Sequence, residues 1–487
     1  MSNHSRFMPA LELASAIRRR ELSAIAATAQ IVDGIRTTQS TLNAYITVDA
    51  DGAMQRAEEA DAAVIRGGDL PPLHGVPVSV KDVINTAGLK TTYGSLTMAD
   101  NVPDADAVAV ERLKKAGANI VGKTTTSEFG HKLLTDAPLF GTTRNPWNLK
   151  LTPGGSSGGS AVAVAAGLGP LSLATDAGAS TRLPAALTGI VGLKPTLGVI
   201  PHNQVPDAFN NYIHLGVMAR TVADAALMLD VVAGEHYSDP HSIGVGPPRA
   251  LAAVQEAAGK RRAVRAAWRP LVGNQLLDDD VRKICEQALA VFREIGWKID
   301  TIDEPIENAE PAWRILQQAN WAARFYARLD ELGARLDPSF VEGIKAGGQY
   351  TGQQLLQATH KRTAHFRSVQ SWFAKHDFVL TPTCSRPPLS VEHRALEPIQ
   401  VNGEDAGDMR KSWVPYLNLF NLTGHPAVSI PCGLSAGGLP IGLQIVGRWY
   451  GDADVLRAAA AYEHVTQFHV HVRPAHAASR NLSAKIA

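Results

Sequence analysis

The chain has 487 residues, more than one compact core usually holds, so it forms either two or more domains or one unusually large α/β sheet. Its 47 Lys and Arg residues and 46 Asp and Glu residues leave a formal charge of +1, and neither sign forms a long block. This balance argues against nucleic acid or an anionic membrane as a partner. Cys285, Cys384 and Cys432 form no CxxC or Cys/His cluster, which argues against a disulfide framework and a structural zinc site.

The first 30 residues contain no apolar run behind a basic segment, so no secretory signal is expected. Residues 11–31 are instead predicted to form one amphipathic helix within an N-terminal helical region, 1–65. The most apolar segment, 161–174, is interrupted by glycines and a proline and falls short of the roughly 20 residues that span a bilayer. These features predict a soluble protein of the reducing cytoplasm.

Strand and helix patterns alternate through the first half of the chain. In chain order they predict a strand over 76–80 that delivers Lys81 to its end, a helix over 106–117, a strand over 119–121, a helix over 160–167, strands over 171–174 and 190–193, and a helix over 221–232. This alternation favours a large α/β/α sandwich around a mixed, mostly parallel, twisted sheet.

Residues 245–376 differ in composition, because glycine is scarcer and charged, helix-forming stretches dominate. Helices are predicted over 278–295 and 311–332, so this region is interpreted as a helical insertion or lid within a single domain, 1–487. Its aromatic residues, Trp313 among them, either pack a core or line a pocket. Strand-like segments return at 378–380, 427–431 and 442–446, which predicts that the last hundred residues complete the first sheet.

Two glycine-rich loops, 154–160 and 176–182, hold the serines Ser156 and Ser180. Glycine permits positive φ and the close approach of a ligand or another backbone. Either loop alone is explained as well by close packing of helices and strands. Together with Lys81, they indicate a site.

Other chemistries remain as weaker alternatives. Gly154–Gly158 matches the GxSxG pattern of a nucleophile elbow, with Ser156 activated by a histidine such as His425. That motif needs a strand directly before it, whereas residues 145–153 contain prolines and polar residues; a lone histidine is also more often structural. A phosphate-binding loop lacks the lysine of GK[ST], and no GxGxxG is present.

The run 154–185 resembles the defining segment of the amidase signature family, the Ser-cisSer-Lys serine hydrolases. Further segments that fit the family, in chain order, are 73–82, 122–129, 145–147, 192–196, 219–222, 424–427 and 438–444. The resemblance covers about 70–230 and 377–465 and leaves the middle uncovered. Such an ordered series of motifs is highly specific.

By motif position, the resemblance implies that Lys81, Ser156 and Ser180 form the catalytic set, with a cis peptide bond before Ser156. Ser180 would be the nucleophile, and Ser156 would pass its proton to Lys81. A lysine acts as a base only when neutral, so its pKa of about 10.4 must fall, and burial in apolar surroundings has that effect. Ser–Lys arrangements are an established alternative to Ser-His-Asp.

The expected oxyanion hole consists of the backbone N–H groups of Ala177, Gly178, Ala179 and Ser180. Ala179 departs from the family pattern, which usually has glycine there, and alanine would be strained if that position required positive φ. Thr125 and Thr181 also depart from the pattern and are expected to reshape the acyl pocket.

Ser157, Asp176 and Arg182 are expected to support the two loops, with Asp176 and Arg182 bracing the Ser180 turn through hydrogen bonds. The alternative for Arg182 is an ordinary solvent-exposed charge. Residues around Phe129, Gly130 and Thr135 are expected to line the substrate pocket.

These expectations describe an amidase that cleaves C–N bonds of linear amides through an acyl-enzyme, without cofactor or metal. A carbamate presents the same carbonyl group, so urethane hydrolysis stays open. A second hypothesis is the glutaminase (A) subunit of a tRNA-dependent amidotransferase, which works in a protein complex. A third is a non-catalytic binding protein, disfavoured because all three catalytic positions are filled. The oligomeric state is open, a homodimer included.

Overall fold

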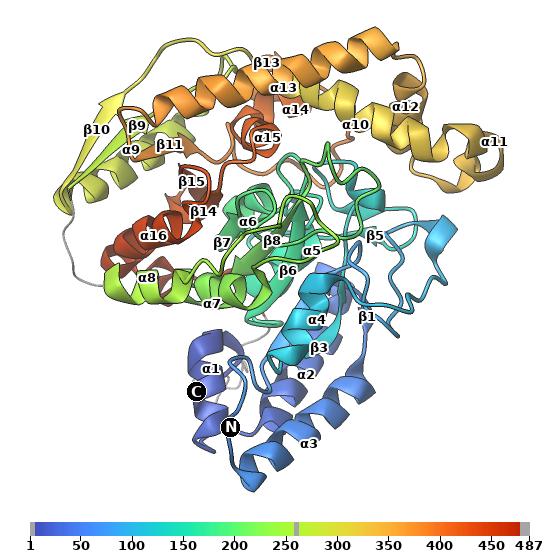
Figure 1. The fold of residues 1–487 in the computed structure, drawn as a ribbon, viewed down its shortest axis with the longest axis vertical. Coiled ribbons are helices and arrows are strands. Elements are labelled where there is room, and N and C mark those ends of the chain that lie inside the picture. The colour runs from blue at the N-terminus through green and yellow to red at the C-terminus, as the bar shows by residue number, and fades with distance from the viewer. Residues whose placement is uncertain (1–4, 258–262, 478–487) are drawn as a thin grey trace, which may run out of the picture.

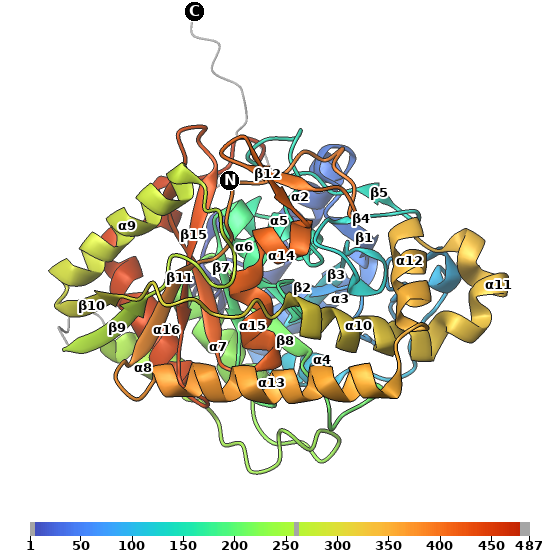
Figure 2. The ribbon, with the colours of Figure 1, turned by 90° about the horizontal axis from the view of Figure 1, so that it is seen from above.

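The computed structural model describes residues 5–257 and 263–477, and over these residues the chain forms an 11-stranded sheet covered by helices (Figures 1 and 2). The strand order across the sheet is β1-β3-β2-β6-β8-β7-β14-β15-β11-β9-β10. The strands are β1 Tyr45–Val48, β2 Pro77–Lys81, β3 Asn119–Thr124, β6 Leu171–Asp176, β7 Val191–Lys194, β8 His214–Ala219, β9 Val264–Trp268, β10 Trp297–Thr301, β11 Phe378–Pro382, β14 Ala427–Leu434 and β15 Pro440–Val446. Two small ladders pair β4 Asp136–Ala137 with β5 Gly141–Thr142, and β12 Ile399–Val401 with β13 Glu404–Gly407.

The sheet is mixed, as predicted. Pairing is parallel within β3-β2-β6 and within β11-β9-β10, and antiparallel between neighbours elsewhere. The strands β11, β14 and β15 come from the last part of the chain and join this same sheet. The expectation that the C-terminal strands complete the first sheet is therefore confirmed.

Helices occupy most of the connections between strands. They are α1 Ala10–Arg18, α2 Ala24–Leu42, α3 Ala50–Arg66, α4 Val108–Lys115, α5 Gly158–Ala165, α6 Arg182–Thr188, α7 Val222–Val232, α8 Ala250–Ala257, α9 Asp279–Glu294, α10 Glu310–Phe325, α11 Leu329–Leu332, α12 Pro338–Gly347, α13 Gly352–Trp372, α14 Met409–Trp413, α15 Pro415–Leu422, α16 Asp452–Thr466 and α17 Phe468–His471, with short 3₁₀ turns at Ser5–Phe7, Leu96–Met98, Glu128–Gly130, Tyr326–Arg328 and Gly333–Arg335.

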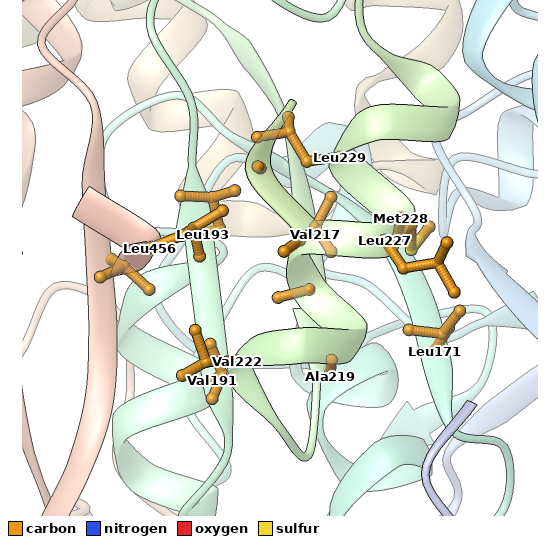
Figure 3. Packing of buried hydrophobic residues seen from close by; sticks show 14 of the residues in the cluster. Leu171, Val191, Leu193, Val217, Ala219, Val222, Leu227, Met228, Leu229 and Leu456 are labelled. Atoms are coloured by element: carbon orange, nitrogen blue, oxygen red, sulfur yellow. The ribbon is translucent and has the colours of Figure 1, made fainter. Parts of the chain in front are cut away.

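Side chains alternate between the two faces of the sheet, as the period of a strand requires. In β8, Leu215 and Val217 belong to the large core formed with α4, α7, α8 and α16, whereas Met218 joins a smaller core with α5 and α6. Figure 3 shows Val217 of β8 and Leu171 of β6 packed against α7. Both faces are thus covered, and the ends of β2 and β6 are held rigidly.

The single helix expected over residues 11–31 is wrong. The structure has two helices, α1 and α2, and between them Arg20 adopts a φ of 61°. A left-handed residue cannot continue a right-handed helix, so the chain turns there although its apolar spacing continues.

Residues 245–376 supply the helices α10 to α13, which Figure 1 shows at the opposite end of the molecule from α1 to α3. The helix predicted over 311–332 ends at Phe325. The region also adds two strands, β9 and β10, which form one edge of the main sheet. Among the described helices, none is both long enough and apolar enough to cross a membrane.

Candidate active site

Lys81 stands at the end of β2, where Val78 and Val80 point into the large core and the lysine side chain is 0% exposed. Its Nζ donates to Ser156 Oγ and to Thr175 Oγ1, both at 2.7 Å. Burial lowers the pKa of the Lys81 amine to about 7, while the negative charge of Asp176 acts in the opposite direction. A lysine in this state exchanges a proton near neutral pH.

The Ser156 loop is shaped by two glycines. Gly154 has a φ of 79°, and the Gly155–Ser156 peptide bond is cis. A Cβ at position 155 would lie 2.7 Å from backbone atoms of Leu133 and Leu134, closer than real Cβ atoms approach, so only glycine fits there. The sequence motif therefore reflects a close approach of two backbone segments.

Thr135, expected in the substrate pocket, is 1% exposed and bonds to the Ser156 loop. Its hydroxyl donates to Gly154 O at 2.7 Å and accepts from the Gly158 N–H at 3.0 Å. Its observed contacts thus hold the loop that carries Ser156.

Ser157 ties the two glycine-rich loops together. Its Oγ donates to Thr175 O at 3.2 Å, and its backbone N–H donates to Ser180 O at 3.3 Å. Thr175 itself was not singled out by any sequence motif, although it directly precedes Asp176 at the end of β6. Its hydroxyl is the second acceptor for Lys81.

Ser180 lies in the turn between β6 and α6 and is 7% exposed. Within residues 5–257 and 263–477, its hydroxyl has no hydrogen-bond partner, and it is not bonded to Ser156. The backbone contact with Ser157 nevertheless brings the loops of Ser156 and Ser180 together.

Asp176 and Arg182 form a bidentate ion pair in which both side chains are 0% exposed. Although burial acts the other way, the charge and hydrogen bonds of Arg182 hold the pKa of the Asp176 carboxyl below its usual value. The carboxylate also accepts the N–H of Thr181 at 3.2 Å, and the guanidinium reaches Gln444 and Asn421. The alternative of a solvent-exposed Arg182 is therefore wrong.

The turn of residues 177–180 presents backbone N–H groups without acceptors. None of these four groups donates a hydrogen bond to any other described residue. Ala179 is 0% exposed, and its φ is not positive. The alanine thus has no left-handed strain.

Phe129 and Gly130 lie beside the Ser156 loop. Phe129 adopts a φ of 48°, rare for a bulky residue, and its ring lies 4.8 Å from that of Phe325 and 5.7 Å from that of Tyr93. Gly130 has a φ of 69°, and a Cβ there would lie 3.2 Å from Ser156 Oγ. An aromatic cluster is thus adjacent to the serine that contacts Lys81.

His425 does not serve as a base in this geometry. It is 0% exposed, its Nδ1 pairs with Thr423 Oγ1 at 2.9 Å, and its ring stacks on Phe373. Burial, and to a lesser degree the charge of Lys194, lower its pKa to about 3. These contacts match the structural role expected of a lone histidine.

Two further residues contact the Ser180 turn from distant segments. Trp313 Nε1 of α10 donates to Ala177 O at 2.6 Å, and Asn421 Nδ2 of α15 donates to Asp176 O at 2.6 Å. Trp313 belongs to the aromatic residues of the 245–376 region, but its spacing alone did not separate pocket from core. Asn421 is preceded by no motif that would have identified it.

Comparison with known proteins extends this description. The family model described as Amidase matches residues 26–456. The acylamidase of Rhodococcus erythropolis is 35% identical over 469 residues, covering 94% of this chain and 95% of that protein. The glutamyl-tRNA(Gln) amidotransferase (A) subunit of Geotalea daltonii is 33% identical over 485 residues, covering 94% of this chain and 97% of that protein.

Among solved structures, a bacterial aryl acylamidase of the amidase signature enzymes superimposes with a TM-score of 0.89 at 28% identity, covering 98% of this chain and 99% of that one. The fold and these matches define an amide hydrolase of the α/β/α type. The chain belongs to the amidase signature family.

Proposed function

We propose that this protein is a serine hydrolase that cleaves the C–N bond of linear amides, or of carbamates, through an acyl-enzyme on Ser180. The observation that carries the proposal is the buried Lys81 amine, with a pKa of about 7, placed 2.7 Å from Ser156 Oγ. A base with a pKa near the working pH removes a proton most effectively.

In the first half-reaction, neutral Lys81 accepts the proton of Ser156 while Ser156 accepts that of Ser180. Ser180 Oγ forms a bond to the carbonyl carbon, and the carbonyl oxygen becomes negative. Collapse of this intermediate breaks the C–N bond, and Lys81 returns the proton through Ser156 to the departing nitrogen. Water then repeats the sequence on the ester, which releases the acid and restores Ser180.

The N–H groups of residues 177–180 are the proposed oxyanion donors, because they lack acceptors and flank the nucleophile. Losing one such donor typically costs about 10²–10³ in kcat. The buried pair of Asp176 and Arg182 supports the same turn from the strand side.

Amides of aromatic amines are the proposed substrate class, and the aromatic cluster at Phe129 supports it. The relatives named acylamidase and aryl acylamidase point the same way. Aryl carbamates are included, since they offer the same carbonyl to the same donors.

Two measurements test the proposal. A fluorophosphonate should label the protein at Ser180, and Ser180→Ala should abolish both labelling and turnover. Alanine at Lys81 or Ser156 should abolish turnover while the fold is kept, by at least about 10³-fold. An activity screen should compare aryl amides, small aliphatic amides and aryl carbamates. Turnover retained by Ser180→Ala would refute the assignment.

The second candidate is a glutaminase subunit of a tRNA-dependent amidotransferase, supported by the relatives of that name at 33% identity. That function requires glutamine as substrate and isolation in a complex with partner subunits. Turnover of aryl amides by the chain alone, without response to glutamine, would decide for the first candidate.

A further inference from the structure

The carbonyl oxygens of the Ser180 turn are held by side chains from outside the turn. Asn421 Nδ2 donates to Asp176 O at 2.6 Å, and Trp313 Nε1 donates to Ala177 O, also at 2.6 Å. Trp313 is 4% exposed, so its bond to the carbonyl has little competition from water.

These bonds fix the direction of the N–H groups as well. In a trans peptide, the C=O and N–H of one plane point in opposite directions. The Gly155–Ser156 bond is the one cis peptide among the described residues, so the peptide joining Ala177 to Gly178 is trans. Because Trp313 holds the Ala177 oxygen on one side, the Gly178 N–H points to the other.

The plane between Ala177 and Gly178 needs such a restraint. Glycine adopts many backbone conformations at little cost, so a peptide that precedes it flips readily. A flipped plane would replace the Gly178 N–H with the Ala177 carbonyl oxygen. An acceptor would then stand where a developing oxyanion requires a donor.

The indole of Trp313 is itself held in place. A Cβ at position 178 would lie 2.8 Å from Trp313 and 2.9 Å from Arg410 Nη2, so both side chains rest directly on Gly178. The Arg410 guanidinium stacks 3.7 Å above the indole, and its Nε donates to Glu310 Oε1 at 3.0 Å. Glu310 is 2% exposed and also accepts from Asn418 at 2.7 Å.

We propose that Trp313 is a positioning residue for the oxyanion hole: its indole N–H holds the Ala177 carbonyl so that the Gly178 N–H faces the reacting carbonyl. This inference rests on the proposed function and deepens it. It also gives the region 245–376 a role, since α10 supplies Trp313 and Glu310, which together with Arg410 of α14 form the support.

Trp313→Phe tests the inference, because phenylalanine keeps a ring under Arg410 and removes only the N–H donor. Expected is a fall in kcat of at least tenfold, towards the roughly 10²–10³ typical of a lost oxyanion donor, with KM changed less than about threefold. The crystal structure of the variant should show the peptide between Ala177 and Gly178 flipped or in two orientations. Trp449→Phe is the matched control, since Trp449 Nε1 donates to Thr423 O at 2.8 Å, and it should keep kcat.

An unchanged kcat or an unchanged peptide plane in Trp313→Phe would overturn the inference. If that variant does not fold, Arg410→Met provides the second test, since it removes the cation stacked on the indole and should lower kcat at constant KM; an unchanged kcat there would count against the inference equally. Failure of the proposed function itself is recognised separately, as absence of wild-type labelling at Ser180. The peptide orientation in the variant would then still decide the role of Trp313.

Discussion

The Nζ atom of Lys81 lies 2.7 Å from the Oγ atom of Ser156, and neither side chain is more than 1% exposed. The lysine is thus both desolvated and directed at a hydroxyl group. Thr175 Oγ1, at 2.7 Å, fixes the amine from a second direction. A charged ammonium is disfavoured in such surroundings, so the neutral amine becomes available near neutral pH.

The first prediction concerns pH. Only neutral Lys81 can accept a proton, and its neutral fraction increases as the pH rises through a pKa of about 7. We therefore expect kcat/KM for an aryl amide to rise with pH up to about 7 and to level off above it. A pH–rate profile of the wild-type enzyme measures this.

Lys81→Arg is the companion variant, because arginine stays protonated throughout this range. It should be inactive at every pH tested. A wild-type profile that is flat, or that falls as the pH rises through 7, would contradict a lysine base.

The second prediction uses two glycines of similar backbone geometry. Gly130 and Gly141 have φ angles of 69° and 82°, so alanine at either should cost about 1–2 kcal/mol of stability. A Cβ at 130 would lie 3.2 Å from Ser156 Oγ, whereas one at 141 meets no atom within 4 Å. Gly130→Ala should therefore displace Ser156 and lower kcat at least tenfold, while Gly141→Ala keeps it. Equal kcat values in the two variants would show that position 130 has no influence on Ser156.

Local patterns predicted the elements that carry the site, because a β-branched strand before Lys81 and two glycine-rich loops have strong short-range preferences. The supports of the loops could not be predicted in this way. Trp313 contacts Ala177 across 136 positions, and Asn421 contacts Asp176 across 245. Such contacts depend on how distant helices pack, which no periodicity encodes.

The third prediction concerns the buried ion pair. Removing Arg182 leaves the Asp176 carboxylate 0% exposed and without its partner, so Arg182→Ala should lower the free energy of unfolding by about 3–5 kcal/mol. Arg265→Ala is the control, since Arg265 and its partner Asp300 are 56% and 39% exposed; it should cost no more than about 1 kcal/mol. Urea unfolding of both variants gives the comparison. Normal stability together with normal kcat in Arg182→Ala would remove the bracing role.

The last prediction concerns Ala179, where the family pattern usually has glycine. Its φ is not positive, and its methyl group is 0% exposed in a cluster with Leu183 and Leu187. Ala179→Gly therefore relieves no strain but removes a buried methyl and adds backbone freedom, which should lower stability by roughly 1–2 kcal/mol. We expect kcat to stay within about threefold, because the N–H groups of the turn keep their directions. An increase in kcat of tenfold or more would instead mean that the alanine distorts the oxyanion turn, and steady-state kinetics alongside urea unfolding separates the two results.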